Sequence, residues 1–324
     1  MPDMTGTPQV SVVIAAWNAA GFLPRAVASV LAQEGVGRPE ILIVEDCSTD
    51  TTLAVAEGLA AHHPEVRVLR NEANSGPARS RNRGIAAAKG EWIAVLDADD
   101  AFAPGRLRRM IDVAEAEGLE ALSDLPVLYD LAADTAAPTQ LAASGGVTRL
   151  DLLRLLSADP ETGLDLGLMK PIYHRSLGER GLLKYPEAIR HGEDNRLYVE
   201  LLRKGVIFGL LREAHYIFST RIGAVSGKYS PGSVTRVDYR ALARQGEALA
   251  AELAAAGELT PELAALMAAR KEQALRQNRI YGWTTLRRGE WGRLRQWLGQ
   301  HPGNGAELAR IALRKLGGQR GRPD

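Results

Sequence analysis

Three acids follow directly after an apolar run, at Asp97, Asp99 and Asp100. The run, residues 92–96, has the composition of a central parallel strand that is covered on both faces. Because open α/β sheets bind ligands at the carboxyl ends of their strands, we expect these acids at a binding edge. Carboxylate oxygens are hard ligands suited to Mg²⁺ or Mn²⁺, which in turn bridge phosphates. An Asp-rich loop that caps the next helix is the competing interpretation, and the three acids alone do not decide between the two.

A second pair of acids ends an earlier strand, predicted at residues 40–44. Glu45 and Asp46 follow that strand, and residues 48–50 are Ser, Thr and Asp, which are favoured as helix N-caps. Capping accounts for residues 48–50 and leaves the two acids unexplained. They are therefore candidates for the same binding edge.

The second half of the chain contains one further acidic motif. Gly192-Glu193-Asp194 opens an amphipathic helix that we predict over residues 195–204. The helix macrodipole also favours an acid pair in a first helical turn, so the residues alone are compatible with a structural role.

The elements that must position these acids alternate between strand and helix over residues 10–110. This alternation predicts an α/β fold with a doubly wound, mostly parallel sheet and right-handed crossovers, in which the acid- and Asn-bearing loops share one edge. We predict strands at 10–14, 40–44, 66–70, 92–96, 123–129, 170–174, 206–211 and 214–218, and helices at 23–33, 51–62, 78–88, 104–118, 150–157 and 195–204.

Length and composition set the class of protein. With 324 residues and 45% hydrophobic content, the chain can form about two domains. Its single cysteine, Cys47, excludes an internal disulfide framework and a multi-cysteine metal site. Residues 1–9 lack the features of a secretory signal, and no stretch approaches the ~20 apolar residues of a spanning helix. We expect a soluble, cytoplasmic protein, at most peripheral at the inner face of the cell membrane.

Five segments, in their order along the chain, resemble a known family. They are residues 10–18, 44–50, 74–84, 91–100 and 192–194. Together they resemble the inverting nucleotide-sugar glycosyltransferases of family 2, which have a GT-A fold, and the resemblance covers about residues 9–230. It implies a nucleotide-sugar donor, usually a UDP-sugar, a divalent cation, Mn²⁺ or Mg²⁺, and transfer to an acceptor hydroxyl with inversion.

The resemblance implies a division of residues 1–236 into two halves, and the change to an alanine-rich, helical composition beyond about residue 237 predicts a separate extension. Residues 1–120 are expected to form the nucleotide-sugar-binding half of the GT-A domain, residues 121–236 the acceptor-binding half, and residues 237–324 a basic helical C-terminal extension. The acceptor implied is a glycan or a lipid-linked glycan, in the assembly of exopolysaccharide, capsule or lipopolysaccharide. The identities of the sugar and of the acceptor cannot be read from the sequence.

The resemblance assigns the donor's nucleotide to loops of the first half. Ala15 and Trp17 match positions that touch the nucleotide base, and Asp46 matches the acid that accepts a hydrogen bond from the ring N–H of the base. Further positions expected to bind the nucleotide sugar are Asn18, Glu45, Gly76, Arg81, Ala98, Arg221 and Lys228. A solvated helix cation is the competing interpretation of Arg81. Arg221 and Lys228 stand where family members have a loop that closes on the diphosphate.

The remaining assignments concern the metal and the acceptor. Asp97 matches a position near the ribose and the metal, and Asp99 matches the metal ligand that holds the diphosphate. Asp100 is expected to contact these residues rather than the metal itself. Asp194 matches the general base that takes the acceptor's proton, with Glu193 orienting it or binding acceptor hydroxyls.

Other interpretations are weighed against this one. A nucleotidyltransferase would also combine a doubly wound sheet, acids and Mg²⁺, but residues 10–22 lack the basic Gly-rich phosphate loop with which such enzymes begin. A P-loop ATPase is excluded because the chain has no G-x-x-x-x-G-K-[ST] motif. An inactive nucleotide-sugar-binding protein stays a third interpretation. His215 is interpreted as a core histidine rather than a metal ligand, and Cys47 as a small residue where the family often has Gly.

The C-terminal residues are strongly basic. Residues 268–324 hold thirteen Lys or Arg against four Asp or Glu, together with Trp283, Trp291 and Trp297. One interpretation is a helical cap with solvated arginines. The other is contact with an anionic membrane surface, where a lipid-linked acceptor would lie. Nucleic-acid binding agrees with the charge, but no motif supports it, and we expect no nucleic-acid partner.

Overall fold

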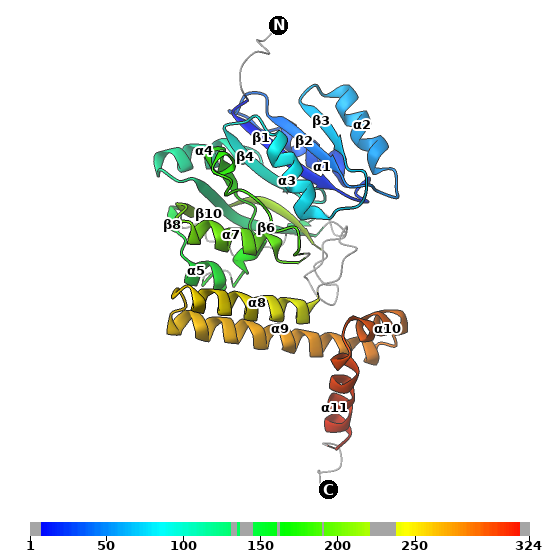
Figure 1. The fold of residues 1–324 in the computed structure, drawn as a ribbon. Coiled ribbons are helices and arrows are strands. Elements are labelled where there is room, and N and C mark those ends of the chain that lie inside the picture. Colours follow the sequence, from blue (N-terminus) through cyan, green and yellow to red (C-terminus); the bar gives the residue numbers. More distant parts are fainter. Residues whose placement is uncertain are drawn as a thin grey trace. The chain divides into compact units, whose positions relative to one another are not determined.

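The computed structural model describes residues 8–130, 135–136, 145–160, 163–189, 191–220 and 238–317. The chain divides into two compact units, Met1–Val234 and Thr235–Asp324. Figure 1 labels the helices and strands of both units.

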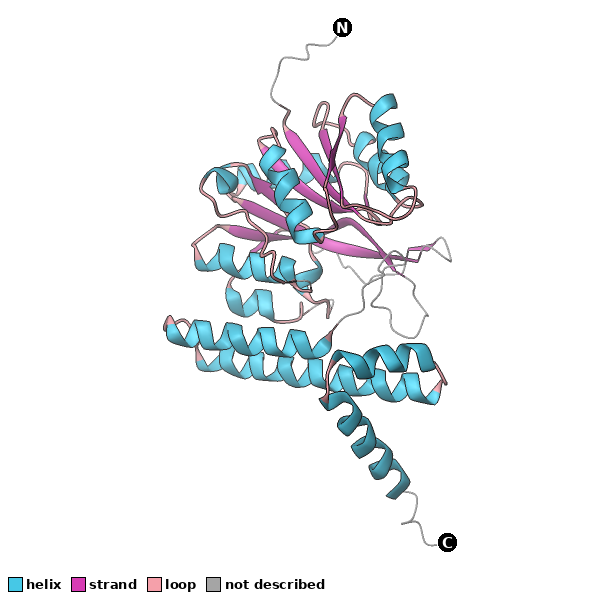
Figure 2. Cartoon of the chain, turned by 45° about the vertical axis from the view of Figure 1, so that its right-hand side comes forward, coloured by secondary structure: helices cyan, strands magenta, loops and turns pink. Residues whose placement is uncertain are grey.

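One mixed sheet forms the centre of the first unit (Figure 2). Its strand order is β3-β2-β1-β4-β9-β6-β10-β5, and β7 and β8 pair with β6 and β10. The strands are β1 (Val10–Ala16), β2 (Glu40–Glu45), β3 (Val66–Arg70), β4 (Trp92–Asp97), β5 (Ala101–Phe102), β6 (Ala121–Asp130), β7 (Thr135–Ala136), β8 (Val147–Arg149), β9 (Ile172–His174) and β10 (Phe208–Thr220).

The N-terminal half of the sheet is parallel. β1 pairs in parallel with β2 and β4, and β2 pairs in parallel with β3. β9 runs antiparallel between β4 and β6, and β6 then pairs in parallel with β10. The predicted doubly wound, mostly parallel sheet followed by C-terminal helices is confirmed, with β9 as the antiparallel strand that joins its two halves.

Apolar and β-branched residues explain why β1, β2 and β4 lie at the centre. Every residue of β2 is buried, as are nearly all residues of β1 and β4, because helices cover the sheet on both faces. The helices of the first unit are α1 (Leu23–Leu31), α2 (Thr52–His62), α3 (Pro77–Ala87), α4 (Arg106–Ala116), α5 (Leu152–Leu156), α6 (Ser176–Glu179) and α7 (Glu193–Arg203), with a short 3₁₀ turn, η1 (Leu166–Leu168).

A glycine brings α3 against the sheet. A Cβ atom at Gly84 would overlap the side chain of Val13 on β1 and press against Val44 on β2. The absence of a side chain at Gly84 therefore lets α3 approach these strands closely, which sets the height of the helix above the sheet.

A buried ion pair joins α4 to the second half of the sheet. Arg106 donates from Nε and Nη2 to the two carboxylate oxygens of Asp124 on β6, at 3.0 and 2.7 Å. Both side chains are fully buried. Nη2 of Arg106 also donates to the backbone oxygen of Lys170 at 2.6 Å, so the same guanidinium fixes the chain just before β9.

The prediction of two strands at 206–211 and 214–218 is wrong. The structure has one strand, β10, whose register against β6 shifts between Leu211 and Ala214 and again before Tyr216. The polar residues Arg212 and Glu213 have the pattern of a turn, but they form ion pairs with Asp159 and Arg109. A bulge therefore accommodates them within a continuous strand.

The second unit is helical. It consists of α8 (Tyr239–Ala255), α9 (Pro261–Arg287), α10 (Trp291–Gln300) and α11 (Gly303–Gly317). α9 begins after Thr260, which caps the helix by accepting from the backbone N–H of Leu263 at 3.2 Å, with Pro261 in the first turn. Among the described residues, no helix is both long and apolar enough to cross a membrane.

Trp297 is a core residue of this unit, so it is not available for the membrane contact that is one of the two interpretations of the basic segment. Its side chain is fully buried against Gly282, where a Cβ atom would overlap the indole ring. Its Nε1 donates to Oδ1 of Asn278 at 2.9 Å, and Asn304 donates to its backbone oxygen at 2.7 Å. Trp297 therefore packs α10 against α9. Trp291, at the start of the same helix, is 68% exposed.

Candidate active site

The carboxyl ends of β1, β2 and β4 lie side by side at one edge of the sheet. The register pairs Ala16 with Glu45 on one side of β1 and Ala15 with Asp97 on the other. Parallel pairing therefore places the acids of β2 and β4 on either side of the first loop. These acids therefore share one edge of the sheet, as the sequence predicts, and that this edge binds a ligand stays a prediction.

Two residues with left-handed backbone shape the loops after β1 and β2. Asn18 has φ of 50° and Cys47 has φ of 57°. Asn18 Oδ1 accepts from the backbone N–H of Thr49 at 2.8 Å, and its own N–H donates to Ser48 Oγ at 3.1 Å. The two loops are thus tied together. The positive φ at Cys47 is a conformation that glycine adopts most easily. The backbone here therefore favours glycine, in addition to the small side chain that the sequence predicts.

Asp46 and Glu45 are both buried and both hold backbone in place. Asp46 accepts from the backbone N–H groups of Ser75 and Gly76 at 2.9 and 2.8 Å, and from the side chain of Asn71 at 2.6 Å. Glu45 accepts from the backbone N–H of Ser48 at 2.6 Å. The predicted base-reading acid therefore also fixes the loop that leads into α3.

Arg81 lies at the centre of a buried charge cluster, so the interpretation of it as a solvated helix cation is wrong. It is 5% exposed, and its Nη2 donates to Asp97 Oδ1 at 2.8 Å while Nη1 donates to Glu193 Oε1 at 2.9 Å. The ring of Tyr185 lies 5.2 Å from the guanidinium carbon. Burial alone would lower the pKa of Arg81, but the carboxylates of Asp194, Asp97 and Glu193 raise it.

Asp194 and Glu193 occupy the first turn of α7 and are each 8% exposed. Asp194 Oδ2 accepts from Nζ of Lys170 at 2.7 Å. Its other oxygen, Oδ1, is buried, lies 3.5 Å from Nη1 of Arg81 and has no hydrogen-bond partner among the described residues. On the same residue, therefore, Oδ2 accepts a hydrogen bond and Oδ1 accepts none.

Lys170 completes the cluster and was not singled out from the sequence. Its Nζ lies 3.0 Å from Asp97 Oδ2 as well as 2.7 Å from Asp194 Oδ2. Burial alone would lower the pKa of Lys170, but the two carboxylates raise it. The only sequence signal is a lysine flanked by Met169 and Pro171 at the start of an apolar segment, where a charged side chain has no solvent.

Asp97 is therefore engaged by two cations. Burial alone would raise its pKa, but Lys170 and Arg81 lower it overall. Asp99 differs, because it forms no ion pair with a described residue. Burial and the nearby charge of Asp97 raise the pKa of Asp99 to about 6.

Asp100 and Ala98 point away from this cluster. Asp100 is 1% exposed and accepts from the hydroxyl of Tyr216 at 2.7 Å and from the backbone N–H of Ser219 at 2.8 Å. Burial and the charges of Asp99 and Asp97 raise its pKa. Ala98 packs its side chain in the hydrophobic core. Asp100 therefore connects the end of β4 to β10 by hydrogen bonds, and Ala98 contributes to the packing there.

A comparison with protein families identifies the family of the chain. The model of glycosyl transferase family 2 matches residues 11–175, just over half of the 324 residues. The chain belongs to glycosyl transferase family 2. The matched range includes the loops after β1, β2 and β4, together with Arg81 and Lys170.

Relatives of this family 2 chain include two proteins of Rhizobium meliloti. The succinoglycan biosynthesis protein ExoO is 37% identical over 230 residues, and ExoU is 32% identical over 225 residues. The matches cover 69% and 68% of this chain and 64% of the length of each relative.

Solved structures share the fold of this family 2 chain. TarS of S. aureus in complex with UDP-GlcNAc gives a TM-score of 0.58 at 19% identity, covering 76% of this chain and 66% of TarS. The mannosyltransferase PcManGT of Pyrobaculum calidifontis, in complex with GDP-Man and Mn²⁺, gives a TM-score of 0.51 at 15% identity, covering 98% of this chain and 89% of that protein. At these identities the likeness establishes the fold, and the GT-A fold class is confirmed.

Arg221 and Lys228 lie outside the described residues. His215 is half-buried, with Nε2 3.0 Å from Glu213 Oε2, so it has a polar partner rather than a purely apolar setting. Within the described ranges, no group of three His, Cys, Asp or Glu side chains is arranged to hold a metal ion.

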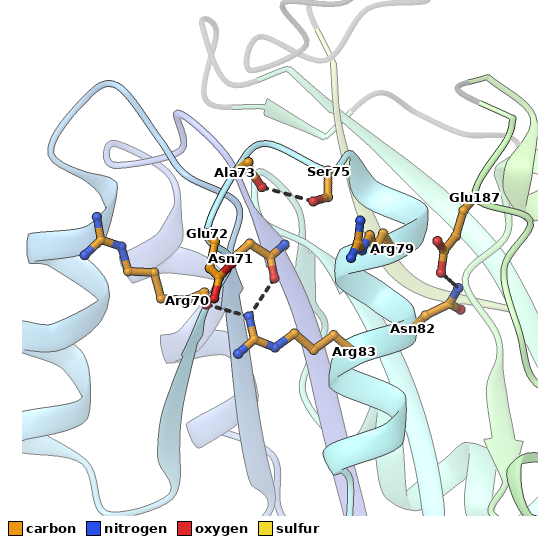
Figure 3. A pocket seen from close by; sticks show the side chains of 9 residues that line it. All are labelled: Arg70, Asn71, Glu72, Ala73, Ser75, Arg79, Asn82, Arg83 and Glu187. Carbon is orange, nitrogen blue, oxygen red and sulfur yellow. Dashed lines mark hydrogen bonds between the residues drawn. The ribbon is translucent and has the colours of Figure 1, made fainter.

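A separate hollow of about 680 Å³ lies along the outer side of α3 (Figure 3). Arg83 reaches across it to the backbone oxygen of Arg70 and the side chain of Asn71, and Glu187 accepts from Asn82 at its other end. Its complete lining is Arg70, Asn71, Glu72, Ala73, Ser75, Arg79, Asn82, Arg83 and Glu187. None of the acids of the charge cluster lines this hollow.

Proposed function

We propose that this protein transfers a sugar from a nucleotide sugar, in first place a UDP-sugar, to an acceptor hydroxyl with inversion at the anomeric carbon. The observation that carries the proposal is the buried cluster in which Arg81 and Lys170 link Asp97, at the end of β4, to Asp194, at the start of α7. An acid at the donor edge and a base candidate are thereby held in one site. Residues 1–120 then bind the donor and residues 121–236 the acceptor.

The nucleotide would lie over the loops that follow β1 and β2. In this proposal Ala15, Trp17 and Asn18 border the base, and Asp46 accepts from its ring N–H. Asp46 already accepts three hydrogen bonds from the loop at 71–76. A carboxylate has about four lone-pair positions, which leaves capacity for one more donor. Those three bonds hold the carboxylate in place before the ligand arrives.

Asp99 is the residue that best fits a divalent cation. Its carboxylate is partly buried, carries a raised pKa and forms no ion pair with a described residue. Magnesium is commonly bound by one or two carboxylates together with substrate phosphates rather than by an all-protein cage. When bound, Mg²⁺ or Mn²⁺ would neutralise the negative charge of the departing diphosphate. Asp97 could join only by exchanging its contacts with Arg81 and Lys170.

The proposed reaction is a single displacement. The acceptor oxygen forms a bond to the anomeric carbon while the bond from that carbon to the diphosphate oxygen breaks, and the electron pair leaves with the nucleoside diphosphate. The proton of the acceptor hydroxyl passes to Asp194, a general-base contribution on the order of 10²–10⁴-fold. Because the nucleophile attacks from the face opposite the leaving group, the product has inverted configuration. Glu193 stays with Arg81 and orients the first turn of α7.

Release of UDP from a panel of UDP-sugars, with and without Mn²⁺ or Mg²⁺, tests the proposal. We expect metal-dependent release with one donor, and a product of inverted configuration by proton NMR once an acceptor is supplied. Asp194→Asn should lower transfer on the order of 10²-fold or more while the donor still binds. Pyrophosphate release would instead indicate a nucleotidyltransferase. Donor binding without turnover, with every acceptor tried, would indicate a binding protein.

We further propose that the acceptor is a lipid-linked glycan of exopolysaccharide assembly and that α10 contacts the anionic inner face of the cell membrane. Support comes from the similarity to ExoO and ExoU, which are succinoglycan biosynthesis proteins, and from one face of α10. Trp291 and Leu298 are 68% and 37% exposed, and Arg295 is exposed between them. Their i, i+4, i+7 spacing aligns an aromatic ring, a cation and an aliphatic chain, a combination that favours anionic lipid.

Sedimentation with vesicles tests this surface. We expect binding to vesicles of phosphatidylglycerol and phosphatidylcholine, weaker binding to phosphatidylcholine alone, and a loss in the double variant Trp291→Ser, Arg295→Ser. Arg293→Ser is the matched control, because this residue is 69% exposed but its position on the helix lies away from that face. Equal binding by the double variant and the control would remove the proposal.

A further inference from the structure

Lys170 is held in place from both sides of its own backbone. Its carbonyl oxygen accepts from Nη2 of Arg106 at 2.6 Å, and the carbonyl of the preceding residue, Met169, accepts from the hydroxyl of Tyr198 at 2.6 Å. Arg106 is itself fixed by its ion pair with Asp124. The side chain of Lys170 therefore leaves a rigid segment, and its ammonium has little freedom.

The ammonium contacts two carboxylates that belong to different parts of the proposed reaction. Its Nζ lies 2.7 Å from Oδ2 of Asp194 and 3.0 Å from Oδ2 of Asp97. Asp97 is also held by Arg81, which donates to its Oδ1 at 2.8 Å. Loss of Lys170 would therefore leave Asp97 with its hydrogen bond from Arg81, but would leave Asp194 with only the longer, 3.5 Å contact between its Oδ1 and Nη1 of Arg81.

The two oxygens of Asp194 are unlike each other. Oδ2 is occupied by Lys170, whereas Oδ1 is buried without a hydrogen-bond partner among the described residues. Buried polar atoms without hydrogen bonds are rare and cost free energy, so the unsatisfied Oδ1 of Asp194 indicates a place for a polar ligand atom.

We propose that Lys170 positions Asp194 for catalysis, holding Oδ2 so that Oδ1 is the oxygen that takes the proton of the acceptor hydroxyl. This inference rests on the proposed function, because it presupposes that Asp194 is the base. Lys170 does not touch the reacting atoms. It fixes the rotation of the carboxylate and couples its position to that of Asp97 at the donor edge.

The expected effect of removing the ammonium is on turnover rather than on donor binding. In Lys170→Met the carboxylate can rotate, and a misplacement of about 1 Å can cost on the order of 10²-fold in rate. We expect kcat for transfer to fall by about that factor while the affinity for UDP with Mn²⁺ stays close to that of the native protein. Lys170→Arg, which keeps the cation, should recover part of the loss. Lys184→Met, at an exposed lysine, is the control and should behave as native.

A double-mutant cycle separates positioning from general stability. If Lys170 acts through Asp194, Lys170→Met in the Asp194→Asn background should add little to the loss already caused by Asp194→Asn. An additive loss, or a kcat within about threefold of native in Lys170→Met alone, would overturn the inference. Calorimetry reports whether each variant folds, and Lys170→Gln replaces Lys170→Met if the latter does not. Failure of the proposed function is distinct, since it would show as no transfer by the native protein.

Discussion

Arg81 and Asp97 form a buried ion pair of 2.8 Å between the helix α3 and the end of the strand β4. The same guanidinium contacts Glu193, on the first turn of α7, at 2.9 Å. Arg81 therefore joins α3 and the neighbouring strand β4 to α7, whose Glu193 lies 112 residues farther along the chain. Its planar group can donate to two carboxylates at once, which the ammonium of a lysine cannot do with the same geometry.

Removing Arg81 should destabilise the fold strongly. Arg81→Met removes the cation that contacts Glu193 and one of the two cations that contact Asp97 and Asp194, and breaking a buried pair in this way costs about 3–5 kcal/mol. Arg79→Met is a matched control, because Arg79 lies on the same helix but is exposed, and its loss should change the free energy of unfolding by less than about 0.5 kcal/mol. Urea denaturation measures both values. Equal losses in the two variants would contradict a stabilising role for the cluster.

Asp99→Asn should abolish the stabilisation of the protein by Mn²⁺ together with UDP. A ligand at 100 times its Kd stabilises the native state by about 2.7 kcal/mol, which is visible as a rise in Tm. The variant should keep the Tm of the ligand-free native protein or exceed it, because a buried carboxylate with a raised pKa is removed. Asp112→Asn, at an exposed acid on α4, should retain the full ligand shift. A full shift in Asp99→Asn would exclude Asp99 as the metal ligand.

Two glycines in helices should respond to alanine with opposite signs. Gly84→Ala forces a methyl group into the side chain of Val13, and overpacking of this kind costs about 1–3 kcal/mol. Gly58→Ala, on α2, places its methyl group where no atom lies within 4 Å, and it should stabilise the protein by about 0.5–1 kcal/mol. Chemical denaturation of both variants tests the pair. A stable Gly84→Ala variant would show that α3 can move away from β1 without cost.

Glu213 should contribute stability that acid removes. Its hydrogen bonds with Arg109, which more than offset burial, lower the pKa of Glu213 from its ordinary value of 4.5 to about 2. A carboxyl group with a depressed folded-state pKa stabilises the fold above its unfolded-state pKa, and this stabilisation is lost as the pH falls from about 4.5 to about 2. The Tm of Glu213→Gln should therefore lie below that of the native protein at pH 7, with the gap narrowing toward pH 2.5. A gap that is the same at both pH values would refute this assignment.

Local patterns in the sequence were sufficient for the first half of the sheet. β3 was predicted with its observed bounds, 66–70, and β1, β2 and β4 within two residues at their ends, since each is a short apolar, β-branched run between polar loops. The positions of acids immediately after β2 and β4 then placed them at one edge, because parallel strands end on the same side of a sheet. This part of the site could be predicted from short segments of the sequence alone.

Long-range contacts decided the rest, because no local pattern specifies which buried charges will meet. Lys170 reaches Asp97 only because β9 inserts antiparallel beside β4, and it reaches Asp194 only because α7 begins at the same place. Trp297 belongs to a strongly basic segment of the sequence, and no local pattern shows that it is buried. Its indole ring packs against Gly282, where a side chain would leave no room for it. The sequence by itself determined the family, the fold class and the acids at the strand ends. The tertiary structure decided which cation holds each acid and which oxygen of Asp194 is left without a hydrogen bond, since burial and pairing depend on residues distant in the chain.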